Sequence, residues 1–221
     1  CDAALKQQLR TTGVKVRSFN GSLLWEPWDV LKLDGTPYRV FTPFYKTCLT
    51  LSPPRAPSHL PSHMEWAEGN YDGVPLDQLG LLPEVRWDKK LEPHWKNGEA
   101  AALDQLSLFL EQGLHGYKTG RDFPARANVS RLSPYLHWGE ISPHQAWHAV
   151  GKSLEDSTHF RRQLAWREFS YYLLYHFPDV QEQNFNRKFD RFAWDCDSDL
   201  LLKWQQGLTG IPFVDAGMRE L

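Results

Sequence analysis

The sequence predicts a mainly helical fold, in which a short α/β segment and a long linker precede an extended helical region. Three observations support this prediction. Residues 13–19 alternate polar and apolar side chains like a short strand, and the turn pair Asn20-Gly21 follows them. Seven prolines between residues 50 and 96 exclude long helices there. From about residue 97, apolar residues recur at spacings of three and four, which is the helical period.

The first 47 residues are predicted to be the end of an α/β domain. After the strand, residues 23–25 form a second short apolar run before Pro27. A helix is expected to begin at Thr42-Pro43, because threonine is a common N-cap and proline favours the first helical position. Residues 48–96 are predicted to be a linker ordered along the surface, because they offer these apolar anchors: Trp66, Tyr71, Leu76, Leu79, Leu81, Leu82, Val85 and Trp87.

Residues 97–221 are predicted to be helical. Ser133-Pro134 and Ser142-Pro143 each indicate a helix start, with serine as the N-cap and proline at the first helical position. The other helices are predicted from the spacing of apolar residues, and glycine or proline marks where a helix ends. The predicted helical segments are 100–113, 134 onward, 143–150, 158–177, 200–206 and 214–221.

Composition limits the classes of function. Apolar residues make up 41% of the chain, which is enough for a sizeable core. The net charge is −2 and the isoelectric point is near 6.5, whereas nucleic-acid-binding domains usually exceed about 9. Between residues 117 and 191, however, eleven basic residues accompany eight acidic ones. Two interpretations therefore remain, namely a mildly basic surface and an ordinary scatter of charges.

Cysteine and histidine usage argues against a metal site. The three cysteines form no CxxC pair and the nine histidines are dispersed, so neither a zinc site nor a disulfide framework is predicted. No run of about 18 apolar residues is present, so no membrane span is predicted. Unpaired cysteines suit a reducing, cytoplasmic compartment. Because the chain begins with Cys1 and ends within a helix-like segment, both ends are expected to be cuts.

Two serines and an arginine precede the helix that Pro134 opens. A helix start offers free N–H groups and a positive dipole end, both of which favour phosphate. Ser130 and Ser133 can donate hydroxyl hydrogen bonds, and Arg131 can pair with an anion. This combination suits a pyrophosphate. A well-capped helix with a surface arginine is the structural alternative, and the spacing alone favours that alternative.

Four residues of the segment 158–177 share one helix face. Gln163, Trp166, Arg167 and Ser170 recur at spacings of three and four. An aromatic plane beside an amide and a guanidinium suits a flipped-out base. The alternative is a core tryptophan beside an Arg–Glu salt bridge, which the pattern alone favours.

Six motifs occur in the order and with the spacing of the photolyase/cryptochrome family, which the chain resembles over essentially its whole length. Six in order are far more specific than one. They cover residues 40–44, 121–124, 130–136, 139–143, 166–169 and 204–219. The resemblance implies the end of a Rossmann-like α/β antenna domain in residues 1–47, an interdomain linker in 48–96, and an incomplete all-helical FAD-binding domain in 97–221.

The resemblance also implies a U-shaped FAD and the residues that bind it. Tyr117 stands where the family has a flavin-contacting tyrosine, and Phe160 where it has a bulky aromatic. The loop that holds the flavin's phosphate region in the family corresponds to Val129, Ser130, Arg131, Leu132 and Ser133. The family often has threonine in place of Val129, so one hydroxyl contact is missing. An antenna chromophore, either methenyltetrahydrofolate or a flavin or deazaflavin, is implied for the full-length protein.

The same resemblance assigns a substrate-facing helix. Trp166 resembles the tryptophan that packs against a flipped pyrimidine dimer, and Gln163, Arg167 and Ser170 share its helix. Gln163 is a departure, because many cyclobutane-dimer photolyases carry glutamate there, whereas several cryptochromes and (6-4) photolyases carry glutamine. Trp194 matches the surface end of the family's tryptophan chain that photoreduces FAD, which gives it a predicted catalytic role in electron transfer.

The implied function is light-driven repair of UV-induced pyrimidine dimers in DNA by electron transfer from reduced FAD. That activity is the carbon–carbon lyase reaction of a deoxyribodipyrimidine photo-lyase, expected to act as a monomer on damaged DNA. The alternatives are a cryptochrome-type blue-light receptor that binds FAD without repair, a (6-4) photolyase, and an inert helical domain. The chain alone is expected to be inactive, because much of the flavin site would lie outside it.

Overall fold

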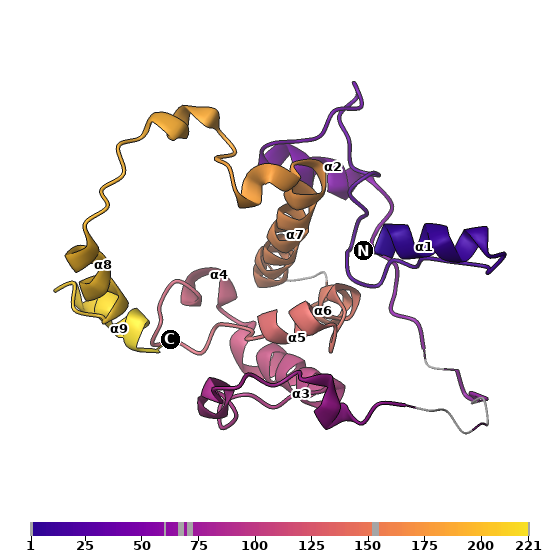
Figure 1. Ribbon diagram of the computed structural model, residues 1–221, viewed down its shortest axis with the longest axis horizontal. Coiled ribbons are helices and arrows are strands. Elements are labelled where there is room, and N and C mark those ends of the chain that lie inside the picture. The colour runs from indigo at the N-terminus through magenta and orange to yellow at the C-terminus, as the bar shows by residue number, and fades with distance from the viewer. Residues whose placement is uncertain (1, 60, 66–68, 70–72, 152–154, 221) are drawn as a thin grey trace. The chain divides into compact units, whose positions relative to one another are not determined.

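The computed structural model describes residues 2–59, 61–65, 69, 73–151 and 155–220, which contain helices and no strands. The chain divides into two compact units, Cys1–His176 and Phe177–Leu221. The prediction of a mainly helical fold is therefore confirmed. Figure 1 shows both units as helices joined by long irregular segments.

Most of the helices lie in the first unit, and α7 is the longest of them at 22 residues. It contacts α2, α4 and α6 (Figure 1). The helices of this unit are α1 (Asp2–Thr11), α2 (Phe41–Thr50), α3 (Glu99–Leu108), α4 (Tyr117–Gly120), α5 (Ser133–Trp138), α6 (Pro143–Ala149) and α7 (Glu155–His176), with a π-helical turn at Phe109–Gly113 and 3-10 turns at Leu76–Leu79 and Trp87–Lys90.

One part of the core of the first unit forms where α7 meets α2 and the loop before it. Phe44 of α2 lies against Phe169 and Tyr172 of α7, with ring centroids 5.0 and 4.8 Å apart. The buried Tyr172 hydroxyl donates to the Val30 carbonyl at 2.8 Å and accepts the Tyr38 N–H at 2.8 Å. This side chain therefore ties α7 to the N-terminal loop through both apolar packing and satisfied hydrogen bonds.

The serine–proline pairs mark helix starts as predicted. Ser142 caps α6 in a reciprocal capping box with Gln145, and Pro143 is the first helical residue. In α5 the helix begins at Ser133 itself and Leu132 occupies the cap position, one residue earlier than predicted. In α2 the helix begins at Phe41, so proline lies in the first turn rather than at its first position.

The predicted strand at residues 13–19 is wrong. Residues 14–20 have no regular secondary structure. A strand needs a neighbouring strand to pair its backbone N–H and C=O groups. No segment of the described residues supplies one, so the alternating pattern leaves the backbone irregular.

The described apolar anchors predicted for the linker are exposed. Trp87, for example, is 61% exposed, and the other described members of the set are also exposed: Leu76, Leu79, Leu81, Leu82 and Val85. Trp66 and Tyr71 lie outside the described residues. Beyond the end of α2 at Thr50, the two 3-10 turns are the helical structure of the described linker, which agrees with the exclusion of long helices by proline.

The second unit is a small helical pair. After 3-10 turns at Pro178–Gln181 and Arg187–Arg191, α8 (Ser198–Gln205) and α9 (Pro212–Glu220) contact one another. Asp197 caps α8 by accepting the N–H groups of Asp199 and Leu200. Asp215 holds the turn between the helices, because its carboxylate accepts the N–H and the hydroxyl of Thr209.

Candidate functional site

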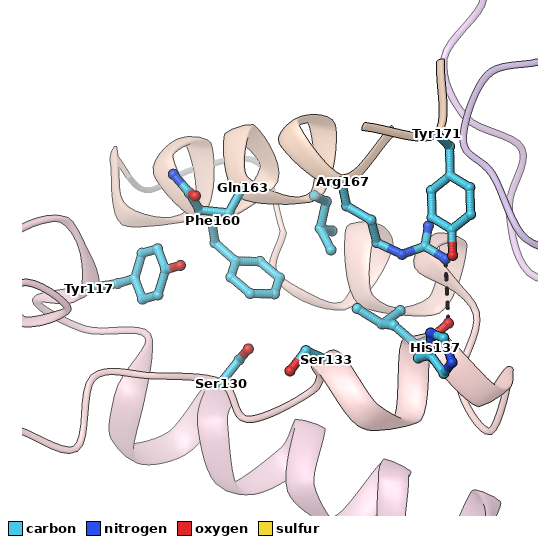
Figure 2. Close-up of a pocket in the computed structure, with 10 residues that line it drawn as sticks. Tyr117, Ser130, Ser133, His137, Phe160, Gln163, Arg167 and Tyr171 are labelled. Carbon is cyan, nitrogen blue, oxygen red and sulfur yellow. Dashed lines mark hydrogen bonds between the residues drawn. The ribbon is translucent and has the colours of Figure 1, made fainter. Parts of the chain in front are cut away.

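The first unit contains a cavity of about 340 Å³ along one side of α7 (Figure 2). This volume is at the lower end of ligand-binding pockets. Four parts of the helical region build it, namely α4, the loop that enters α5, α5 itself and α7. The residues that line it are Tyr117, Ser130, Ser133, Leu136, His137, Phe160, Gln163, Leu164, Arg167 and Tyr171.

One end of the cavity is aromatic. The rings of Tyr117 and Phe160 meet edge to face, with centroids 5.6 Å apart and an interplanar angle of 81°. Phe109 packs behind both rings. Burial raises the pKa of the Tyr117 phenol, and the Arg121 guanidinium, which donates to its oxygen at 3.4 Å, opposes that rise. The phenol therefore stays neutral and can face an apolar ring system.

The start of α4, which carries Tyr117, is held from two sides. Asp156 of α7 accepts the backbone N–H groups of Gly116 and Lys118 at 2.9 and 2.8 Å. The Asn128 amide nitrogen donates to the Gly113 and His115 carbonyls at 2.9 Å each. These bonds satisfy the backbone of a sharp turn and fix where Tyr117 enters the cavity.

The second wall is the loop at residues 130–133. Arg131 has φ of 52°, the one positive value among non-glycine residues of the described chain. Such a conformation is uncommon and concentrates at functional sites. The Gln105 side chain holds the loop by donating to the Ser130 carbonyl at 2.9 Å. The Ser133 side chain lines the cavity, and the Ser130 hydroxyl accepts the Leu132 N–H at 3.4 Å.

The predicted phosphate loop lies only partly at the cavity. Ser130 and Ser133 line it, together with the predicted Tyr117 and Phe160. The Leu132 side chain points into the core and is 1% exposed. Val129 and Arg131 are exposed and do not line the cavity. Because α5 is only six residues long, its dipole adds little to this wall.

The third wall is one face of α7. Gln163, Arg167 and Tyr171 follow one another at spacings of four and line the cavity together. Figure 2 shows Arg167 and Tyr171 at the end opposite Tyr117. The Gln163 amide has no hydrogen-bond partner among the described residues. By contrast, the Arg167 guanidinium donates to the carbonyls of Ser22 and Leu136.

Trp166 and Ser170 lie outside the cavity, although they share the helix. The Trp166 ring stacks on Phe41 of α2, with centroids 3.7 Å apart, and 44% of the residue stays exposed. The exposed Ser170 hydroxyl donates to the Trp166 carbonyl at 3.1 Å. The four residues predicted to share a face of α7 therefore divide into two pairs. Gln163 and Arg167 line the cavity, and Trp166 and Ser170 lie at the surface.

Two family models match this chain. Residues 1–62 match the DNA photolyase model, and residues 160–221 match the FAD binding domain of DNA photolyase. Over its full length the chain is 44% identical to a deoxyribodipyrimidine photo-lyase of Agrobacterium fabrum, and it covers 47% of that protein. The chain belongs to the photolyase/cryptochrome family. The predicted family resemblance is confirmed.

Other members of the photolyase/cryptochrome family agree in sequence and in fold. Cryptochrome-2 of Arabidopsis thaliana is 33% identical over the whole chain, which covers 39% of it. The crystal structure of a bacterial class III photolyase from Agrobacterium tumefaciens superposes with a TM-score of 0.90 at 43% identity, over 99% of this chain and 47% of that one. The chain therefore spans about half the length of the family members it matches.

The cavity residues fit a flavin cofactor of the family. Tyr117 and Phe160 offer apolar ring surfaces, and Ser130 and Ser133 offer hydroxyl donors. The Gln163 amide adds a donor and an acceptor that no described residue uses. The volume accommodates part of a dinucleotide.

Several cavity residues were not predicted from the sequence. Tyr171 could have been found, because it lies four residues after Arg167 on the same face. His137 and Leu136 had no such signal, since they reach the cavity from the far end of α5. The predicted Trp194 belongs to the second unit, where it is 70% exposed beside Phe192.

A second cavity, of about 370 Å³, lies between residues 20–29, residues 51–55 and α6. Trp25 Nε1 and His144 Nδ1 line this region and are buried without a hydrogen-bond partner in the described chain. Burial, and then the Arg55 and His148 charges, lower the pKa of His144 to about 4. Among the described residues no group of three potential ligands could hold a metal ion, and no helix is long and apolar enough to cross a membrane.

Proposed function

We propose that this chain is the central part of a deoxyribodipyrimidine photo-lyase, which repairs UV-induced pyrimidine dimers in DNA by light-driven electron transfer from reduced FAD. The observation that carries the proposal is the cavity beside α7, where Tyr117, Phe160 and Ser133 converge. It lies in a chain whose residues 160–221 match a photolyase FAD-binding domain. The domain division at residues 47 and 96 is part of the same proposal.

The residues of the chain would hold the cofactor in two ways. Tyr117 and Phe160 would pack against flat ring surface, and the Ser130 and Ser133 hydroxyls would donate to phosphate oxygens. Leu132 points into the core, and the exposed Val129 and Arg131 side chains do not line the cavity, so all three would contribute backbone groups. When bound, reduced FAD supplies the electron for dimer cleavage after it absorbs light.

The DNA-facing surface would be the exposed side of α7. Trp166 offers a partly exposed indole fixed on Phe41, which suits stacking against a base turned out of the duplex. Gln163, which is half-buried at the cavity, would hydrogen-bond that base. The exposed Ser170 lies one turn of α7 after Trp166. Arg167 is committed to two backbone carbonyls and one carboxylate, so it would act at the cavity wall rather than on a phosphate.

The proposal extends to the protein as a whole. It would act as a monomer on a flipped dimer in DNA, in the compartment that holds bacterial DNA, the cytoplasm. Contacts from the basic side chains to phosphate would make binding weaken as salt rises. An antenna chromophore in the full-length protein, methenyltetrahydrofolate or a flavin or deazaflavin, would extend the absorption. Much of the cofactor site would come from outside this chain, so the chain alone would be inactive.

A cryptochrome-type light receptor or a (6-4) photolyase is the second candidate. The observation that favours it is Gln163, which is half-buried at the cavity and carries an amide. An amide can hydrogen-bond a base but cannot donate the proton of a carboxylic acid. The 33% identity to an Arabidopsis cryptochrome is consistent with this candidate as well.

The deciding experiment uses the full-length protein. Its absorption spectrum reports bound flavin, and illumination with oligonucleotides that carry either a cyclobutane dimer or a (6-4) lesion reports repair. We expect flavin absorption and repair of the cyclobutane dimer. Bound flavin with repair of neither lesion would favour the receptor, repair of the (6-4) lesion alone would favour the second enzyme, and absence of flavin would refute both.

A further inference from the structure

Glu168 is a carboxylic acid buried in the middle of α7. The residue is 2% exposed, and its side chain points toward the loop at residues 22–25. Oε2 accepts the backbone N–H of Leu24 at 2.6 Å. Oε1 accepts from the guanidinium of the preceding residue, Arg167, at 3.0 Å. One buried carboxylate therefore joins a loop of the N-terminal segment to a side chain that lines the cavity.

Arg167 extends this connection to the opposite wall. Its Nη1 donates to the Ser22 carbonyl at 2.9 Å. Its Nη2 donates to the Leu136 carbonyl of α5 at 3.4 Å (Figure 2). The guanidinium also lies over the Tyr171 ring, 4.8 Å from its centroid. The planar fork of arginine can satisfy three such partners at once, and lysine cannot. The guanidinium thus spans the loop, α5 and α7 at one end of the cavity.

The groups that face Glu168 come from each element around it. They are the Arg167 guanidinium on its own helix, the Leu24 and Trp25 N–H groups of the loop, and the Cys48 thiol of α2. Burial raises the pKa of Cys48 to about 12, so the thiol carries no charge at neutral pH. Burial also raises the pKa of Glu168 to about 7, against the opposing effect of the N–H groups and Arg167.

We propose that Glu168 is a positioning residue, which fixes Arg167 as one wall of the cavity and couples cofactor affinity to its own charge. When the carboxylate is ionised, it holds the guanidinium against the Ser22 and Leu136 carbonyls. When it is neutral, the ion pair is lost and that end of the cavity loosens. The identity of the ligand rests on the proposed function, whereas the coupling between Glu168, Arg167 and the loop does not.

The first test measures FAD binding to the full-length apoprotein above and below neutral pH. In the wild type, we expect affinity about tenfold higher near pH 8 than near pH 6, because only the one pH unit below the Glu168 pKa of about 7 contributes, at most about tenfold per proton. Glu168→Gln keeps an acceptor for the Leu24 N–H but carries no charge. Its affinity should be weak at both pH values. Unchanged affinity and an unchanged pH profile in this variant would overturn the proposal.

Two control variants separate this effect from other titrations. Glu155→Gln removes an exposed acid from the same helix, where Glu155 pairs with Lys118, and it should keep the wild-type profile. His137 also lines this end of the cavity. His137→Gln should also keep the pH dependence, and its loss in that variant would assign the effect to histidine instead.

A double-mutant cycle tests whether Glu168 acts through Arg167. Arg167→Lys keeps the positive charge and loses the fork, so each single change should weaken FAD binding and the double change should add little more. Additive losses would mean that the two residues act independently, and the proposal would fail.

Amide hydrogen exchange gives a readout that does not depend on FAD. The Leu24 and Trp25 N–H groups should exchange faster in Glu168→Gln than in the wild type, and faster near pH 6 than near pH 8 once intrinsic rates are subtracted. Equal protection in both proteins would refute the coupling. If the wild type shows this protection yet binds no FAD, the proposed function fails while the coupling stands.

Discussion

The indole of Trp166 lies flat on the phenyl ring of Phe41, with centroids 3.7 Å apart and planes within 9°. Phe41 is 3% exposed and begins α2, whereas Trp166 is partly exposed on α7. The stack fixes the orientation of an indole that would otherwise rotate freely at the surface. It also means that a residue of the N-terminal segment sets the geometry of the proposed DNA-facing helix.

Replacing Phe41 by leucine should therefore weaken binding of dimer-containing DNA. The change removes the stack but keeps an apolar side chain, and it should destabilise the full-length protein by about 1–2 kcal/mol, in the range of an aromatic pair plus a small packing loss. Phe44→Leu is the matched control, because Phe44 packs on Phe169 and Tyr172 instead of Trp166. Gel-shift affinity should fall several-fold only for the Phe41 variant, and equal affinities would contradict the prediction.

Gly120→Ala should disturb the aromatic end of the cavity. A Cβ at Gly120 would collide with the Asn128 side chain, which holds the Gly113 and His115 carbonyls ahead of Tyr117. We expect a loss of about 1–3 kcal/mol in the free energy of unfolding, the usual cost of overpacking. Flavin binding should weaken as well.

The control for that change is Gly21→Ala, because a Cβ there meets no atom within 4 Å. Urea unfolding and FAD titration of both full-length variants provide the comparison. A Gly120→Ala protein with wild-type stability would show that Asn128 relaxes without consequence for Tyr117.

Stability should depend on pH through two buried groups with opposite signs. The pKa of His144 falls from 6.5 to about 4 on folding, so its contribution is present above pH 6.5 and is lost as the pH drops toward 4. The pKa of Glu168 rises from 4.5 to about 7, so its contribution is present below pH 4.5 and is lost as the pH climbs toward 7. Each shift corresponds to about 3 kcal/mol of unfolding free energy. Between about pH 4.5 and 6.5 the two groups change the stability in opposite directions as the pH rises.

Single substitutions should expose each slope in turn. In Glu168→Gln, the free energy of unfolding should rise more steeply with pH than in the wild type, because only the His144 contribution remains. In His144→Leu it should fall as the pH rises, because only the Glu168 contribution remains. Urea denaturation of the full-length protein across about pH 4.5–7 measures both slopes. Parallel profiles of the two variants would refute the assignment.

Local chemistry made most of the helices predictable. Ser142 and Gln145 form a capping box, whose two hydrogen bonds need no residue outside the helix start. The alternating run at residues 13–19 failed for the opposite reason, since a strand depends on a partner segment that the described chain does not contain. Elements that satisfy their own backbone can be predicted from sequence, and elements that need a distant partner cannot.

The same distinction applies to the candidate site. The spacing of Gln163 and Arg167 predicted a shared face of α7, and both residues line the cavity. Periodicity could not reveal that Trp166 turns toward Phe41, nor that Arg167 binds the Ser22 carbonyl, because both partners lie far away in the sequence. Such contacts appear only when α2 and the N-terminal loop pack on α7.

Trp194→Phe should slow photoreduction of the flavin in the full-length protein and leave repair by pre-reduced enzyme unchanged. Trp194 is 70% exposed beside Phe192, as expected of a residue that passes an electron between solvent and a buried chain of aromatics. Trp138→Phe is the matched control, because Trp138 is also exposed, at 77%, but lies in the first unit. Absorbance at the flavin band under blue light, with an external reductant, follows the rate. A normal rate in Trp194→Phe would remove this residue from the electron path, and a slow rate in both variants would point to a general loss of accessible tryptophan.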